Sequence, residues 1–243
     1  MEGILPVSFH LDHVGPLTRT AGDLEVVFAA MMDRRPATGP SAAPPVLSRL
    51  DEYFLEHADT NVREALETAI EKLSDAEWKK SPRLPDSFAD LHGHHRTIMA
   101  VDAAQVHRAL FEQSPEAFSP QVAALIEEGL ATPLWDYVTA LRHQHDFRKQ
   151  IRRMMHAAPL LVMPATPTTA PGPETTGDAK FNSPWSYCGL PAVTIPCGLD
   201  KMGLPVGLQL VGPYHTEGEL LAAAAWCESR LGFQGGPRLS SSG

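Results

Sequence analysis

The sequence predicts an α/β fold, a β-sheet covered by helices, and three observations carry this prediction. Two apolar, β-branched runs, Ala192–Pro196 and Val206–Val211, flank a short stretch rich in turn formers, so they indicate a strand, a tight loop and a second strand. A third apolar run, Leu160–Met163, indicates a buried strand. Long segments with helical spacing lie between and around these runs, which is typical of a sheet with flanking helices.

The paired strands are predicted to lie inside the sheet. Both runs are apolar on consecutive positions instead of alternating, so we expect both of their faces to be covered. Because proline cannot donate to the ladder, Pro191 and Pro196 are expected at the ends of the first strand.

The N-terminal region predicts an extended segment followed by a helix. Residues 1–16 contain bracketing prolines, and Thr20 with Asp23 forms a capping box in front of apolar residues at helical spacing. We expect a helix over 21–33, then an irregular connection over 35–45.

A βα unit is predicted next. Residues 46–50 form a strand candidate, and Asp59 with Thr60 caps a helix whose apolar side chains share one face. A strand followed by a crossover helix favours a parallel neighbour in the sheet.

Residues 86–156 predict a helical layer of three segments. The pattern is interrupted at Ser114-Pro115, Ser119-Pro120 and Thr132-Pro133. Proline after Thr132 is typical of a helix start, so a long helix is expected to run from there to about Ala157.

The remaining segments complete one domain over 1–232. The Pro- and Thr-rich stretch 164–177 has no regular period and is expected to line or cover a site. Thr216 is expected to cap a last helix that ends at Leu231, and 233–243 is expected to form a disordered polar tail.

Charge and composition exclude some partners and favour a cytoplasmic location. The 243 residues carry a formal net charge of −9, which argues against a nucleic-acid backbone or an anionic membrane as partner. Three cysteines, an odd number without a C-x-x-C pair, are expected to be reduced thiols. No apolar run reaches the roughly 18 residues of a membrane span, and no export signal is evident.

Histidines offer a candidate metal site and a candidate base, each with a structural alternative. The densest group of histidines is His92, His94 and His95. Neighbouring side chains on a helix point about 100° apart, so we favour a position on a helix surface beside the core over a metal site. His10 and His13 flank Asp12 and suggest a general base, yet side chains of an extended segment alternate, which favours a role in the turn before Gly15-Pro16.

Two further groups suggest nucleophilic chemistry. Cys188 has no local feature that lowers its pKa, so packing is favoured. Lys180 with Ser183 and Ser186 supplies the ingredients of Ser–Lys amide hydrolysis, but a base requires an unprotonated, buried lysine, and this segment looks exposed.

Three stretches resemble the amidase signature family, which includes fatty-acid amide hydrolases and the glutamyl-tRNA(Gln) amidotransferase A chain. They are GILPVSFHLDHVGPLTRT (3–20), LLVMPATPTTAP (160–171) and NSPWSYCGLPAVTIPCG (182–198) continued by GLPVGLQLVG (203–212). The resemblance implies the C-terminal part of a mixed-sheet amidase-signature fold with flanking helices and an incomplete sheet.

The resemblance also implies amide hydrolysis by Ser-cisSer-Lys chemistry without a cofactor. The family's lysine and its Gly-Gly-Ser-Ser-Gly loop precede the motif that begins here at Gly3, so no catalytic residue is assigned to this chain. Phe181, Asn182 and Trp185 are implied to lie near the acyl pocket and to bind a small aryl or alkyl amide.

Three hypotheses follow. The first is an amide hydrolase that lacks its catalytic segment and is inactive alone; the second is a non-catalytic binding or interaction remnant of the same fold. A third relocates the nucleophile to Cys188 or Ser186. Because an incomplete sheet leaves an open edge, association or homo-oligomerisation through that edge is expected.

Overall fold

A computed structural model of the protein describes residues 3–33 and 43–234. The chain divides into two compact units. The helical unit contains residues 1–15, 84–156 and 182–190, and the sheet unit contains 16–83, 157–181 and 191–243. The expected tail at 233–243 falls almost entirely outside the described residues, and the prediction of one domain over 1–232 stays a prediction.

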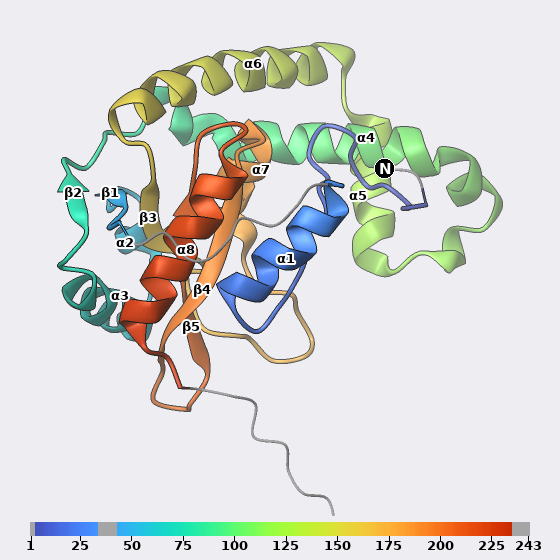
Figure 1. The fold of residues 1–243 in the computed structure, drawn as a ribbon. Helices are drawn as coiled ribbons and strands as arrows, with labels where there is room; N and C mark the ends of the chain where they lie inside the picture. Colours follow the sequence, from blue (N-terminus) through green and yellow to red (C-terminus); the bar gives the residue numbers. More distant parts are fainter. Residues whose placement is uncertain (1–2, 34–42, 235–243) are drawn as a thin grey trace, which may run out of the picture. The chain divides into compact units, whose positions relative to one another are not determined.

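The sheet unit is built on a five-stranded mixed sheet in the order β2-β1-β3-β5-β4 (Figure 1). β1 runs parallel to β2 and β3, whereas β5 runs antiparallel to β3 and β4. The strands are β1 (Val46–Arg49), β2 (Glu77–Lys79), β3 (Leu161–Pro164), β4 (Ala192–Leu199) and β5 (Pro205–Val211). The predicted α/β class, the strand pair and the parallel neighbour of the βα unit are therefore confirmed.

The prediction for Pro196 was wrong. β4 continues to Leu199, and Pro196 lies inside the strand, where the register with β5 shifts between Pro196 and Gly198. A bulge tolerates proline because the ladder is already interrupted there, and β4 is an edge strand of the described sheet.

The expected burial of both strand faces holds for β5 but not for β4. Side chains of β5 are buried over most of its length. In β4, by contrast, buried Val193 and Ile195 alternate with exposed Ala192 and Thr194. One face of β4 is therefore open, as in a strand that packs against helices on one side.

Helices cover the sheet. α8 lies across β4 and β5, α3 contacts β3, β4 and β5, and α1 packs on α8 (Figure 1). The backbone N–H of Ala21 donates to both carboxylate oxygens of Glu228, at 3.1 and 3.0 Å, which fixes the start of α1 on α8. These helices are α1 (Ala21–Met31), α2 (Phe54–His57), α3 (Thr60–Lys72) and α8 (Glu217–Leu231), with the 3₁₀ turn η3 (Ala179–Phe181).

Two predicted helix caps are confirmed and one is wrong. The side chain of Thr20 accepts from the N–H of Asp23, and that of Asp59 accepts from the N–H of Val62. Thr216 does not cap α8 with its side chain, because its hydroxyl donates to the carbonyl of Pro213 at 2.9 Å.

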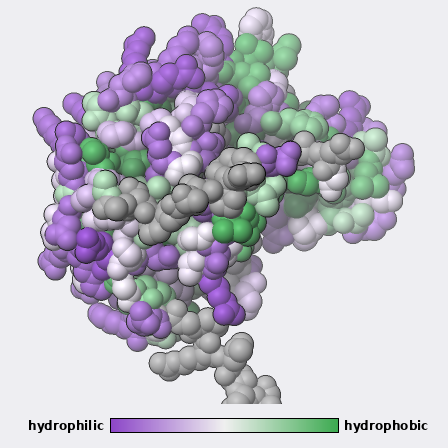
Figure 2. Space-filling model, in the orientation of Figure 1, coloured by the Kyte–Doolittle hydropathy of each residue, from purple (hydrophilic) through white to green (hydrophobic). Residues whose placement is uncertain are grey.

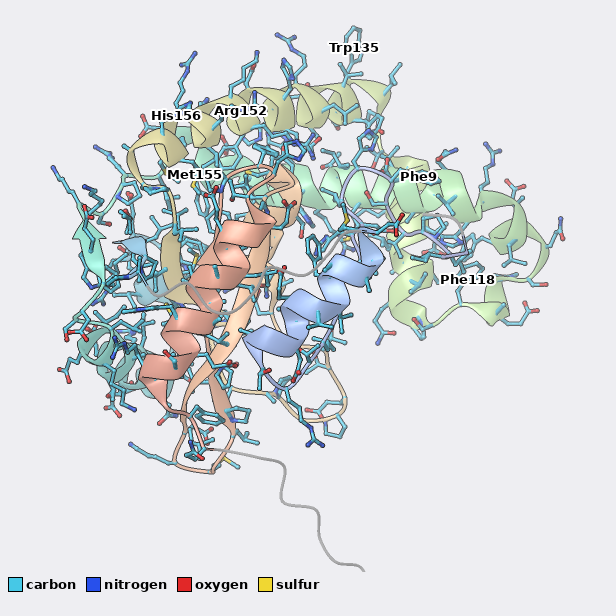
Figure 3. All side chains as sticks on the ribbon, viewed as in Figure 1. Phe9, Phe118, Trp135, Arg152, Met155 and His156 are labelled. Carbon is cyan, nitrogen blue, oxygen red and sulfur yellow. The ribbon has the colours of Figure 1, made fainter. Side chains whose placement is uncertain are left out.

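The helical unit contains the three predicted segments, each broken where the sequence places proline. Trp135 projects away from α6, whereas Met155 of the same helix is buried (Figure 3). The elements are η1 (Asp86–Asp90), α4 (Leu91–Gln113), η2 (Pro115–Ala117), α5 (Pro120–Ala131), α6 (Leu134–Ala157) and α7 (Ser183–Cys188). Over the described ranges, no helix combines the length and the apolar run that crossing a membrane requires.

Candidate functional site

The predicted substrate-binding residues lie at and just before α7, a short helix of the helical unit. Asn182 precedes it, and Pro184 stands in its first turn. The helix ends at Gly189, which has a φ of 73° and whose N–H donates to the carbonyl of Trp185 at 2.8 Å. Because this left-handed conformation favours glycine, Gly189 fixes where α7 stops.

Tyr187 anchors α7 to the long helix α6. Its side chain is fully buried. Its carbonyl accepts from Gln144 Nε2 at 3.1 Å and from Arg148 Nε at 2.9 Å. Its hydroxyl lies 2.8 Å from His143 Nδ1 and 3.2 Å from the carbonyl of Ala140. Each polar atom of Tyr187 that faces α6 is therefore paired.

The ring of His143 bridges Ser87 and Tyr187. Nε2 lies 2.9 Å from the carbonyl of Ser87, which can only accept, so Nε2 carries the hydrogen. Nδ1 lies 2.8 Å from the hydroxyl of Tyr187, and that hydroxyl donates to the carbonyl of Ala140. Burial raises the pKa of Tyr187 above its ordinary value, so the phenol stays protonated and this pair holds α7 in place.

Two histidines of α4 also face α7. His92 Nδ1 lies 3.2 Å from Ser183 Oγ, and the His95 ring packs against that of Tyr187, with centroids 6.1 Å apart. Burial, and to a smaller degree the charge of His92, lowers the pKa of His95 to about 4. His95 is therefore neutral at pH 7. Across residues 3–33 and 43–234, no group of three or more His, Cys, Asp or Glu side chains is arranged to hold a metal ion.

The three predicted substrate-binding residues differ in accessibility. Phe181 belongs to the sheet unit, is fully buried and packs on Phe54 with ring centroids 5.0 Å apart. Trp185 is buried in the helical unit, whereas the side chain of Asn182 is exposed. A role for these residues in substrate binding stays a prediction.

Two candidate reactive groups of this segment, the thiol of Cys188 and the amine of Lys180, are not activated. Cys188 is buried, and burial raises the pKa of its thiol. Lys180 pairs with Asp178 at 2.7 Å, and this hydrogen-bonded partner raises the pKa of the ammonium. A nucleophilic cysteine must react as the thiolate, and a lysine base must be unprotonated. The raised pKa values of both groups therefore disfavour Cys188 as a relocated nucleophile and Lys180 as a base.

The structure reveals a buried carboxylate that the sequence did not indicate. Asp102 of α4 is 5% exposed and accepts from Ser8 Oγ at 2.6 Å and from the hydroxyl of Tyr137 at 3.1 Å. His10 Nδ1 lies 2.8 Å from the same carboxylate, and the N–H of His10 donates to it at 3.3 Å. Burial, followed by the charge of Asp102, raises the pKa of Tyr137 to about 12. Residues 8–10 are therefore fastened to α4.

The suggested base around Asp12 does not form, and the structural alternative fits the geometry. The Asp12 carboxylate accepts from the N–H groups of Val7 and Ser8, at 2.7 and 3.1 Å, and so closes a turn. His13 Nδ1 lies 3.1 Å from the carbonyl of Leu11 instead of facing Asp12.

A groove of about 460 Å³ separates part of α4 from α6. Asp90, His94 and Asp136 are among the residues that line it. Burial, followed by the charge of His143, lowers the pKa of His94. The described residues of the lining include no serine, cysteine or lysine, so the groove offers no nucleophile for amide chemistry.

Comparison with known proteins identifies relatives of this fold and sequence. The family model described as Amidase matches residues 1–221. An amidase of Pseudomonas putida is 26% identical over 274 aligned residues, which cover 99% of this chain and 58% of that protein. The A chain of the glutamyl-tRNA(Gln) amidotransferase from a Synechococcus strain is 26% identical, over 91% of this chain and 56% of its own length.

A solved structure described as an amidase superposes with a TM-score of 0.84 at 28% identity, over 94% of this chain and 55% of that one. The chain therefore spans little more than half the length of the relatives that it matches.

Proposed function

The chain belongs to the amidase family, and on that premise we propose that its 243 residues form the C-terminal part of an amide hydrolase domain. Ser-cisSer-Lys chemistry, supplied by residues outside this sequence, cleaves the carbon–nitrogen bond of a small amide. The part described above shapes the pocket and does not react.

The state of the candidate reactive groups supports this division of roles. The sequence contains no Gly-Gly-Ser-Ser-Gly run. Cys188 is buried with a raised pKa, and Lys180 is held protonated by Asp178. The observation that carries the proposal is the family match, which extends over residues 1–221 while the relatives continue well beyond the matched part.

The α7 region supports a role in shaping the acyl pocket. Tyr187 fixes α7 through four contacts to α6, so the backbone of Asn182 and Trp185 is held in place. We assign the exposed amide of Asn182 to contact with the substrate and the buried ring of Trp185, in the same helical unit, to the support of the pocket wall. A role of Phe181, which belongs to the sheet unit, stays a prediction. Few polar groups in an aromatic wall suit a small aryl or alkyl amide.

Hydrolysis by the chain alone tests the proposal in its simplest form. The purified chain is incubated with benzamide and butyramide, and ammonia is measured against a heat-killed control. We expect no release above the control, because the reactive groups lie elsewhere. Ammonia production that survives repurification would show that these residues contain the chemistry.

A hybrid amidase tests whether the chain can complete an active domain. In this hybrid, the 243 residues replace the matching segment of the Pseudomonas putida amidase. We expect the hybrid to release ammonia from an amide that the parent enzyme hydrolyses. A soluble, cooperatively folded hybrid without activity would contradict the proposed function.

The partner and location predictions belong to the same proposal. β4 pairs only with β5 among the described strands, so its other edge is the place where further strands or a second copy add to the sheet. The acidic net charge of −9 and the three thiols support a cytoplasmic protein.

A further inference from the structure

α1 is apolar around almost its whole circumference. Between Ala21 and Met31 only Asp23 and Glu25 are charged, and both lie in the first half of the helix. A helix that packs against its own fold on one side and faces water on the other normally carries charged residues on the outer side. α1 lacks this outer polar face.

One face of α1 is covered by the sheet unit and the opposite face is exposed. Ala21 and Ala29 are buried where α1 packs on α8. Val26, Val27 and Met31 are 55%, 39% and 51% exposed. Together with exposed Ala30 they recur four residues apart, so they lie side by side on the helix surface. Figure 2 shows a hydrophobic area where Figure 1 draws α1.

The helix cannot turn this face inward. The N–H of Ala21 donates to both carboxylate oxygens of Glu228, and Thr20 caps the first turn. Rotation about the helix axis would break these bonds and expose Ala29, which is now completely buried. The apolar outer face therefore needs a cover that the described residues of the sheet unit do not supply.

The size of the face argues against a second copy of the chain as that cover. A stable dimer buries about 800 Å² on each partner. Four small or medium side chains on one helix fall well short of that area. The relatives, by contrast, contain this fold as 55% to 58% of a longer chain.

Resting on the proposed function, we propose that Val26, Val27, Ala30 and Met31 form an interface for the part of the amidase domain that lies outside these 243 residues. The interface is nonpolar and contributes to folding of the whole domain. It lies on an element other than the α7 region that we assign to substrate.

Cysteine labelling tests this interface. Val27→Cys is introduced into the isolated chain and into the hybrid amidase, and the rate of maleimide labelling is measured. The three native cysteines are buried and react slowly by comparison. We expect the new thiol to react rapidly in the isolated chain and at least tenfold more slowly in the hybrid. Met202→Cys, at a position 84% exposed between β4 and β5, is the matched control and is expected to react rapidly in both.

The outcomes separate this inference from the proposed function. Equal labelling at position 27 in the two proteins, with a cooperatively folded hybrid, overturns the interface. Slow labelling in an isolated chain that light scattering shows to be a dimer also overturns it, because the cover is then a second copy. A hybrid that protects position 27 but hydrolyses no amide supports the interface and counts against the proposed function. A hybrid that never melts cooperatively counts against both.

Discussion

Tyr187 and His143 show how single residues of the helical unit fix the candidate site. The tyrosine hydroxyl has two partners, His143 Nδ1 and the carbonyl of Ala140, and neither partner is near it in the sequence. The sequence stretch NSPWSYCG places a tyrosine in this region but gives no sign of what it meets. Pairings of this kind depend on how the helices pack, so they could not be predicted from local pattern.

Removal of the Tyr187 hydroxyl is expected to destabilise the chain. Tyr187→Phe keeps the ring but removes the hydroxyl that His143 Nδ1 and the carbonyl of Ala140 share as a partner, which should lower the free energy of unfolding by about 1–2 kcal/mol. Urea denaturation of the two proteins measures this difference. A double-mutant cycle with His143→Phe is the control, and additive effects of the two changes would refute the coupling.

The lowered pKa of His95 predicts a loss of stability in mild acid. Its folded-state pKa of about 4 lies below the ordinary value of 6.5, so the folded protein favours the neutral ring. The contribution is complete above pH 6.5 and is lost as the pH falls from 6.5 toward 4, by at most about 3 kcal/mol.

Denaturation of the wild type and of His95→Leu at pH 7.5 and pH 5 checks whether His95 causes this loss of stability. We expect the fall in unfolding free energy between the two pH values to be smaller in His95→Leu. His145→Gln, which changes an exposed histidine of α6, should retain the wild-type fall. An unchanged fall in His95→Leu would show that other groups cause the acid sensitivity.

The elements themselves were largely readable from the sequence. Proline and capping residues marked the ends of α3, α5 and α6, and apolar runs marked β3, β4 and β5. α2, β2 and α7 were missed because each has six residues or fewer, too short for a period to appear. The bulge in β4 was missed because Pro196 was assumed to end the strand.

The contact between α4 and α5 depends on one glycine. A Cβ on Gly129 would lie 1.9 Å from the carbonyl oxygen of Ala100, on a rigid backbone. Gly129→Ala must therefore push the helices apart and is expected to cost about 3 kcal/mol.

Gly93→Ala in α4 is the matched control, because nothing lies within 4 Å of its added Cβ. This second change should gain at most about 1 kcal/mol, since alanine loses less backbone freedom than glycine when it joins a helix. Thermal melts of both variants and of the wild type measure these changes in stability. A Gly129→Ala protein as stable as wild type would mean that the two helices do not approach so closely.

On the scale of the whole molecule, the sequence motifs indicate the family, and the structure adds contacts that the motifs do not indicate. The motifs at 3–20, 160–171 and 182–212 identify the family, and the mixed sheet agrees with its fold. The fastening of residues 8–10 by Asp102 and the apolar outer face of α1 became visible only in three dimensions. Both arise from residues that are far apart in sequence or unremarkable in isolation.

The central claim is that the reactive groups of the amidase lie outside these residues, and the position of a covalent label tests it most directly. The isolated chain and the hybrid amidase are treated with a fluorophosphonate, and the modified residue is mapped by mass spectrometry. The account predicts no modification of the isolated chain and, in the hybrid, a modified serine within the Pseudomonas putida part. Modification of Ser186, Cys188 or any other residue of the 243, abolished by its alanine variant, would contradict it.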